Sequence, residues 1–387
     1  MGGLSATLGA SSSSIHTKIG VKSPDDVVIV DAVRTPMTRG KKGGFKDTVP
    51  STPPSSTTSV SALFSKPPAA PRMAALYAGY PEKTSLYTTN RQCSSGLQAV
   101  VNIATHIQSG LIDIGIGAGV ESMTMGYGAS AMPPQTSTQI AEASAPARDC
   151  QLPMGVTSEN VAKDFGIDRA RQDAFSATSF QKAALAQRQG KFESEIVPVK
   201  TTIKDEQGNE KEIVVSKDDG IREGVTEESL AKLKPAFGGL TTAGSASQVS
   251  DGAAAVLLMK RKTAQKLGLP ILGKYVASAV VGVPPRIMGV GPAYAIPAVC
   301  KKAGVEIKDV DVIELNEAFA SQAVYVMEQL GLDPEKVNPV GGAIAMGHRA
   351  RQIATILPEL KRQNKKLGLT TMCIGTGMGM ACIIERE

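Results

Sequence analysis

The sequence predicts an α/β protein made of two similar halves, and three observations support that fold class. A β-branched and aromatic run at 85–89 is typical of a buried strand, and after a short turn apolar residues recur at helical spacing over 97–107. The last third repeats this order, with a strand-like run at 310–315, a turn, and a helical face over 319–330. Hydrophobic residues make up 42% of the 387, which is enough to bury a large core.

The other expected elements follow the same two periodicities. A helical pattern at 169–189 is the clearest element within 124–248, which is otherwise polar and irregular. The remaining apolar runs are short, and we expect strands at 26–30, 113–123, 251–259, 369–372 and 380–384. The glycines of 113–123 open no helix and are followed by no ribose-binding acid, so they indicate close backbone approach and not a dinucleotide site.

Two segments lack the composition of regular structure. Residues 1–24 are rich in Gly and Ser with no acid before Asp25, and we expect a disordered tail or the remnant of a targeting segment. Residues 49–71 are rich in Pro, Ser, Thr and Ala. Because proline breaks helices and removes a donor from a strand ladder, we expect a loop there, with neither a helix nor a strand.

Charge and cysteine content exclude several classes of protein. The net charge of +6 is spread among acids, and aromatics are only 4%, so the clustered basic stripe of a nucleic-acid-binding protein is missing. The mild positive charge suits a polyanionic small ligand, or merely a solvated surface. No apolar run approaches the ~18–20 residues of a membrane-spanning helix. Five cysteines without a repeated spacing predict thiols, and neither a disulfide framework nor a metal site.

Cys93 is the first candidate for catalysis. It lies in the predicted turn between an extended run and a helix, where unpaired N–H groups and the helix dipole favour a thiolate. The alternative is a small buried hydrophobe, which is the commoner role of a single cysteine. Of the three histidines, His16 lies in the predicted tail and His106 on the polar face of a helix. His348, in a glycine-containing turn, is left as the candidate base, although a solitary histidine is usually structural.

Four ordered motifs then resemble those of the thiolases, in particular the peroxisomal 3-ketoacyl-CoA type. They are Asn-Arg-Gln-Cys-Ser-Ser-Gly-Leu-Gln-Ala at 90–99, Asn-Glu-Ala-Phe at 316–319, Gly-His at 347–348 and Cys-Ile-Gly-Thr-Gly-Met-Gly at 373–379. The resemblance implies the thiolase fold, with duplicated halves that each hold a mixed five-stranded sheet with helices on both faces. It implies an N-terminal domain at 25–262, a CoA-binding loop domain inserted at about 124–248, and a C-terminal domain at 268–387.

The resemblance also implies the chemistry. The chain is expected to cleave 3-ketoacyl-CoA with CoA in fatty-acid β-oxidation, by a ping-pong reaction through an acyl-cysteine, as a homodimer. Cys93 would be the nucleophile, His348 the base and Cys373 the second acid and base, with Asn316 and Gly375 helping to bind the oxyanions. CoA would be a co-substrate, with no metal and no permanently bound cofactor. The implied CoA contacts are Arg222 and Ser229 at the nucleotide, and Met154, Phe237, Ala243, Ser247, Ala318 and Phe319 along the pantetheine.

The chain departs from the family pattern at two places. The segment at 48–71 replaces an expected helix and strand, and the turn between His348 and Arg351 is shorter than the family's by roughly five residues. An alternative is therefore a thiolase-like protein that binds CoA or a partner subunit without turnover. A ketoacyl synthase is less compatible, because that group lacks a cysteine in a terminal Cys-x-Gly turn such as that of Cys373. The resemblance implies a peroxisomal location, with the cytoplasm as the alternative because no targeting signal is visible in the sequence.

Overall fold

The computed structural model describes residues 19–48, 61–62, 69–127, 137–347 and 351–387. Within them, nine strands form one mixed sheet in the order β3-β4-β7-β1-β8-β11-β10-β9, with β2 paired to β7. The β3–β4 and β9–β10 pairs are parallel and the others are antiparallel. The strands are β1 (Val27–Arg34), β2 (Thr38–Arg39), β3 (Ser61–Ala62), β4 (Ile114–Ser122), β7 (Ser250–Lys260), β8 (Gly273–Gly282), β9 (Val312–Leu315), β10 (Leu367–Ile374) and β11 (Met378–Arg386).

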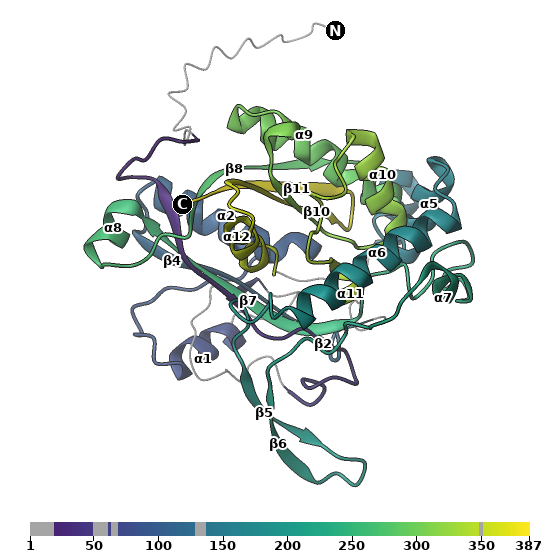
Figure 1. The fold of residues 1–387 in the computed structure, drawn as a ribbon, viewed down its shortest axis with the longest axis horizontal. Coiled ribbons are helices and arrows are strands. Elements are labelled where there is room, and N and C mark those ends of the chain that lie inside the picture. The colour runs from purple at the N-terminus through teal and green to yellow at the C-terminus, as the bar shows by residue number, and fades with distance from the viewer. Residues whose placement is uncertain (1–18, 49–60, 63–68, 128–136, 348–350) are drawn as a thin grey trace, which may run out of the picture.

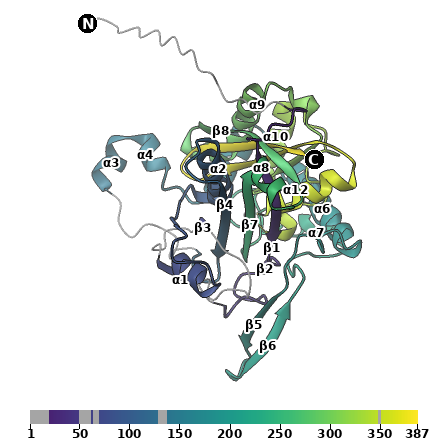
Figure 2. The same cartoon turned by 90° about the vertical axis from the view of Figure 1, so that its left-hand side faces the viewer.

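Helices lie on both faces of this sheet, and a separate hairpin projects from the body (Figures 1 and 2). The α-helices are α1 (Ala69–Tyr77), α2 (Ser95–Gln108), α3 (Thr138–Ala143), α4 (Ala145–Asp149), α5 (Met154–Asp164), α6 (Arg169–Arg188), α7 (Glu227–Ala231), α8 (Arg261–Lys266), α9 (Gly291–Ala303), α10 (Ala320–Leu330), α11 (Ala343–Met346) and α12 (Gln352–Arg362). Short 3₁₀ segments are η1 (Gln92–Ser94), η3 (Pro285–Val290) and η4 (Ile307–Asp309), and the hairpin consists of β5 (Val199–Lys204) and β6 (Glu210–Val215).

The α/β class and the two-part organisation predicted from the sequence are confirmed. Strands β1 to β4 and β7 belong to the N-terminal half, and β8 to β11 to the C-terminal half. The halves join where β1 pairs with β8 at only two positions, Val28 with Lys274 and Ile29 with Gly273. In the described part of the C-terminal half, a fifth strand is reduced to a single parallel bridge between Ile313 and Val337.

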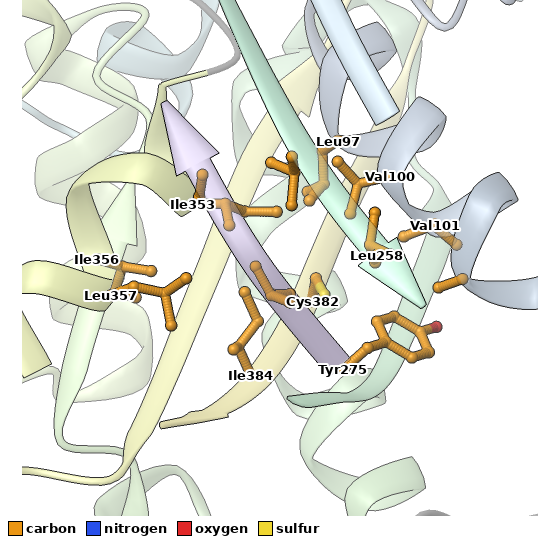
Figure 3. Close-up of a cluster of buried hydrophobic side chains, with 14 of the residues drawn as sticks. Leu97, Val100, Val101, Leu258, Tyr275, Ile353, Ile356, Leu357, Cys382 and Ile384 are labelled. Carbon is orange, nitrogen blue, oxygen red and sulfur yellow. The ribbon is translucent and has the colours of Figure 1, made fainter. Parts of the chain in front are cut away.

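The main core lies between the strands of the two halves. Helices α2 and α12 occupy this space. Figure 3 shows Leu97 and Val100 of α2 and Ile353 of α12 gathered in one apolar cluster with Leu258 of β7 and Ile384 of β11. A second apolar cluster joins α9 and α10 to the opposite face of β8 to β11. Strands buried on both faces read as continuous apolar runs, which is why the sequence of β1 shows no alternation.

Several individual elements are where the sequence predicted them. The helical patterns at 97–107, 169–189 and 319–330 are α2, α6 and α10, and the strand at 113–123 is β4. The close backbone approach expected of its glycines is also present. A Cβ atom on Gly117 would lie 2.5 Å from the Cα atom of Val100, so only glycine lets α2 pack this closely on β4.

The strand predicted at 85–89 is wrong. This stretch has no regular secondary structure and pairs with no described strand, and Tyr87 is 38% exposed. Composition of this kind indicates only that a segment suits a pleated, half-buried surface, and a strand also needs a partner edge. Described pairing on that side of β4 comes from the two residues of β3.

We expected neither a helix nor a strand at 49–71, and this is wrong for residues 61–62 and 69–71. Ser61–Ala62 forms β3, and α1 begins at Ala69. Pro71 is compatible with this helix because it stands in the first turn, where the missing N–H has no intrahelical partner. The rest of the predicted loop lies outside the described residues.

The predicted disordered tail at 1–24 is wrong for residues 19–24, and 1–18 lie outside the described residues. The backbone N–H of Gly20 donates to the Glu385 carboxylate at 2.9 Å, and Lys22 forms an ion pair with Glu387 at 2.8 Å. Both partners belong to the C-terminal end of the chain, so local composition could not reveal them.

The charged stretch at 200–212 is also more regular than its sequence predicted. It forms most of the β5–β6 hairpin, with ion pairs across the strands between Lys200 and Glu212 at 2.9 Å and between Lys204 and Glu210 at 3.7 Å. Opposite charges that face each other across a strand pair favour pairing even when both faces are solvated.

Candidate active site

The turn that carries Cys93 is held by its own polar side chains. The Asn90 side chain accepts a hydrogen bond from the N–H of Gln92 at 2.8 Å. The hydroxyl of Ser95 accepts from the N–H of Arg91 at 2.9 Å and donates to the carbonyl of Gln92 at 2.7 Å. These bonds shape η1, which presents the half-buried Cys93 two residues before Ser95, the first residue of α2. The expected placement of Cys93 at a helix start is therefore present.

Cys373 lies near the end of β10 and is fully buried. Burial raises the pKa of its thiol far above the usual range, the neighbouring Cys93 sulfur raises this pKa further, and a hydrogen bond with the Asn316 side chain opposes the shift. Contact between η1 and β10 brings the two cysteines together from opposite halves of the chain. Cys373 is thus a protonated thiol at neutral pH, as a proton donor must be.

Asn316 directly follows β9 and is buried. Its backbone N–H donates to the carbonyl of Thr371 at 3.0 Å, so the turn after β9 is fixed to the neighbouring strand β10 two residues before Cys373. Three of the predicted catalytic residues, Cys93, Asn316 and Cys373, therefore meet at one place in the fold.

Gly375 lies in the turn between β10 and β11, where Thr376 and Gly377 both have positive φ. A Cβ atom at Gly375 would lie 3.5 Å from the sulfur of Met154 and 3.9 Å from Cγ of Gln92. The turn thus faces both the first residue of α5 and the residue that precedes Cys93.

Three of the six predicted pantetheine residues pack in the cluster of Cys373, and two more contact members of that cluster. Met154, Ala318 and Phe319 belong to the same apolar cluster as Cys373. The ring of Phe237 meets that of Phe319 edge to face at 6.4 Å, and the N–H of Ser247 donates to the carbonyl of Ala318 at 2.9 Å. An apolar wall with backbone polar groups nearby suits a long flexible thioester arm.

The other three predicted CoA contacts lie at the surface, outside that cluster. Arg222 is exposed in the segment between β6 and α7, and Ala243 is exposed in the turn before β7. Ser229 is exposed too, and its hydroxyl takes part in the capping box of α7 with Thr226. The hydroxyl of Ser229 therefore already has a local structural role.

His348 lies outside the described residues. Gly347, which precedes it, has φ of +100°, and a Cβ atom there would overlap the hydroxyl of Ser250. A side chain at position 347 would therefore be excluded both by backbone conformation and by space.

Two family models match the chain. The thiolase N-terminal domain matches residues 58–262, and the thiolase C-terminal domain matches residues 269–386. The chain belongs to the thiolase family.

Relatives of this thiolase have high identity over nearly the whole chain. "3-ketoacyl-CoA thiolase, peroxisomal" of Yarrowia lipolytica is 51% identical over 95% of this chain and 94% of its own length. "3-ketoacyl-CoA thiolase B, peroxisomal" of Rattus norvegicus is 53% identical over 94% of this chain and 91% of its own length. The dimeric peroxisomal thiolase of Saccharomyces cerevisiae matches the structure with a TM-score of 0.85 and 44% identity, over 95% of this chain and 99% of that one.

Some residues of this thiolase's site were missed at the sequence level. Met288 of η3 belongs to the apolar cluster of Cys373 and Phe319, and Ala246 packs against this cluster. Neither stands in one of the four motifs, and an apolar side chain in a loop gives no signal of its own.

Across the described residues, no group of three or more His, Cys, Asp or Glu side chains could hold a metal ion. No helix among them is long and apolar enough to span a membrane.

Proposed function

We propose that this thiolase cleaves 3-ketoacyl-CoA with CoA, giving acetyl-CoA and an acyl-CoA shortened by the acetyl unit, as a step of fatty-acid β-oxidation. The observation that carries the proposal is the meeting of the Cys93 turn, the buried Cys373 thiol and the Asn316 side chain. Such a pair of cysteines supplies one nucleophile and one proton donor. Relatives named as peroxisomal 3-ketoacyl-CoA thiolases give independent support.

In the first half-reaction, His348 takes the proton of Cys93, and the thiolate attacks the 3-keto carbon. The bond between C2 and C3 breaks, and Cys373 gives its proton to C2 of the departing acetyl-CoA. In the second half-reaction, Cys373 takes the thiol proton of a new CoA. The CoA thiolate attacks the acyl group on Cys93, which leaves as a thiolate and regains its proton from His348.

Two oxyanions form along this path and need separate donors. His348 and a water bound by Asn316 would hold the first, which develops on the 3-keto oxygen when Cys93 attacks. The backbone N–H groups of Cys93 and Gly375 would hold the second, on the acyl-thioester oxygen. The approach of Gly375 to the Cys93 turn supports this division.

CoA is a co-substrate in this scheme and no cofactor stays bound, because acyl transfer and Claisen cleavage involve no net electron transfer. The inserted segment at about 124–248 of an N-terminal domain at 25–262 would hold the nucleotide through Arg222 and Ser229. The pantetheine would then run past Phe237 and Ala243 towards the cluster of Met154 and Cys373, and the C-terminal domain at 268–387 would supply the rest of the site.

We place the enzyme in the peroxisome and treat it as a homodimer. The location follows the names of the relatives, and the assembly follows the dimeric yeast thiolase.

A second candidate is a thiolase-like protein that binds CoA or a partner subunit without turnover. The short turn after His348 favours it, because a ~1 Å displacement of a catalytic group can cost ~10²-fold in rate. The contacts of the residues that follow this turn favour an active enzyme, because they fix the start of the next helix. Arg351 forms a buried ion pair with Glu314 at 3.3 Å, and the Gln352 amide donates to the carbonyls of Glu314 and Thr371 at 2.7 and 3.1 Å. The start of α12 is therefore tied to both β9 and β10.

An assay of the purified chain separates the two candidates. Incubation with 3-ketoacyl-CoA should give acetyl-CoA only when CoA is added, and peptide mass analysis should find the acyl group on Cys93. A chain that binds CoA but leaves 3-ketoacyl-CoA unchanged would support the second candidate.

A further inference from the structure

Glu317 is a buried acid that the reaction scheme does not use. It follows Asn316 in the turn between β9 and α10, and only 1% of its surface is exposed. A carboxylate taken out of water is costly unless hydrogen-bond donors surround it. A role for Glu317 therefore has to be sought in its partners.

Three donors from three separate elements converge on this carboxylate. The hydroxyl of Ser179 in α6 donates to one oxygen at 2.7 Å, and the backbone N–H of Ile344 in α11 donates to the same oxygen at 3.0 Å. The side-chain amide of Asn338 donates to the other oxygen at 2.7 Å. Burial raises the pKa of Glu317, and these three hydrogen bonds, with the more distant charge of Arg351, oppose the rise.

The glycine pair before α11 is shaped to this carboxylate. A Cβ atom on Gly342 would overlap the carboxyl group of Glu317. Gly341 has φ of +84°, and a Cβ atom there would lie 2.6 Å from the side chain of Ala183 in α6. The N–H of Gly342 donates to the Ser179 hydroxyl at 3.1 Å, which completes the ring of contacts.

Asn338 links the same carboxylate to β9. Its side chain accepts from the N–H of Leu315 and donates to the carbonyl of Leu315, both at 2.9 Å, as a neighbouring strand would. Both chain neighbours of Asn316, Leu315 and Glu317, are thus hydrogen-bonded to Asn338, which fixes the position of Asn316 between them.

We propose that Glu317 is a positioning residue, whose carboxylate fixes the Asn316 turn relative to the α11 segment that ends at Gly347. This inference rests on the proposed function, in which Asn316 and the residue after Gly347 act on the same oxyanion. Glu317 touches no reacting atom. It holds the Asn316 turn against α11, the segment that leads to Gly347.

The test compares Glu317→Gln, Ser179→Ala and the control Glu335→Gln, which changes an exposed acid between α10 and Asn338. A glutamine would place an amide N–H₂ against groups that already donate. We expect kcat to fall about 100-fold in E317Q and about 10-fold in S179A, with KM for CoA changed by less than about twofold. E335Q should match the wild type. S179A keeps the carboxylate and two of its donors, so it tests the proposal even if E317Q does not fold.

A second readout does not need turnover. The rate of Cys93 alkylation by iodoacetamide, measured against pH, should have a higher midpoint in E317Q and S179A than in the wild type, because a displaced base stabilises the thiolate less. Unchanged kcat per folded molecule together with an unchanged midpoint would overturn the proposal, even if the melting temperature fell. A wild-type chain that cleaves nothing would refute the proposed function instead. The alkylation midpoints would then decide the role of Glu317 alone, with a shift supporting it and no shift refuting it.

Discussion

The turn of Cys93 and the turn of Asn316 have the same order in the sequence, an extended run, a polar turn and an amphipathic helix. In the structure they are held in different ways. The hydrogen bonds that shape the Cys93 turn join residues two to four positions apart. Around Asn316 the corresponding bonds join residues 23, 27 and 138 positions apart. The extended run also differs, since β9 is fully buried whereas 85–89 is unpaired and partly exposed.

This difference fits the division of roles that we propose for the two halves. The N-terminal half presents Cys93, the proposed nucleophile, on a locally built turn that is only half-buried, where a substrate can reach it. The C-terminal half holds Asn316 and Cys373 in a buried frame built from distant segments, where preorganised polar groups act most strongly.

The largest effect is expected from removing the cysteine of the buried frame. Cys373→Ala should lower cleavage by about 10³-fold or more, because proton transfer at C2 is lost. Acylation of Cys93 by a simple acyl-CoA should remain, since it requires no proton at that carbon. Peptide mass analysis and a cleavage assay would measure the two steps.

Cys382→Ala is the matched control, because Cys382 is an equally buried thiol on the adjacent strand β11. It should retain both steps. Equal loss of acylation and cleavage in the Cys373 variant, or an acyl group on Cys150, Cys300 or Cys382, would contradict the division between the halves.

Stability should differ between the two extended runs. Leu315→Ala in β9 removes a side chain that is 1% exposed, and should cost about 2–5 kcal/mol of unfolding free energy. Leu86→Ala, in the unpaired run before Cys93, should cost about 1 kcal/mol or less. Urea unfolding would measure both. Similar costs would mean that the run before Cys93 is as firmly held as β9.

The buried frame should also make stability depend on pH. Burial raises the pKa of Glu314 in β9 from 4.5 to about 7, and the nearby Arg351 only partly opposes this. A carboxyl group with a raised folded-state pKa binds its proton more tightly in the folded state. Its contribution to stability is therefore complete below pH ~4.5 and is lost as pH rises through ~7, by up to about 3 kcal/mol.

Thermal unfolding between pH 5 and 8.5 would test this dependence. Wild-type stability should fall by more than that of Glu314→Gln over this range, and the difference between the two slopes isolates Glu314 from other titrating groups. Parallel slopes would contradict the prediction.

The smallest effect is expected in the local turn. Ser95→Ala removes the hydroxyl that bonds Arg91 and Gln92, and should cost about 1 kcal/mol. Asn338→Ala, which removes bonds to both Leu315 and Glu317, should cost more. The reverse order would contradict the contrast between a local and a long-range turn.

The same contrast explains what the sequence could predict. Elements set by short-range periodicity, such as α2, α6 and β4, could be located from the sequence, and so could the turn of Cys93. The role of Cys373 came from a family resemblance, because no spacing reveals that residues 93 and 373 lie together. The burial of Glu317 and the ion pair of Arg351 depend on partners far along the chain. The sequence around an acidic residue does not indicate whether such partners bury it. The strand predicted at 85–89 is wrong because the types of side chain in a segment do not indicate whether a neighbouring strand has a free edge to pair with it.

The pairing of β1 has a consequence for how the chain is made. Val27 pairs with Lys260, so this strand is synthesised 233 residues before its partner (260 − 27). At ~5–20 residues per second, the wait is on the order of 10–50 s. Throughout that time the run Val27–Val30, fully covered in the finished molecule, has no strand of the central sheet beside it. The time for which it is exposed to chaperones or to other nascent chains is therefore set by the length of the chain between β1 and β7, and not by the strength of any contact in the folded protein.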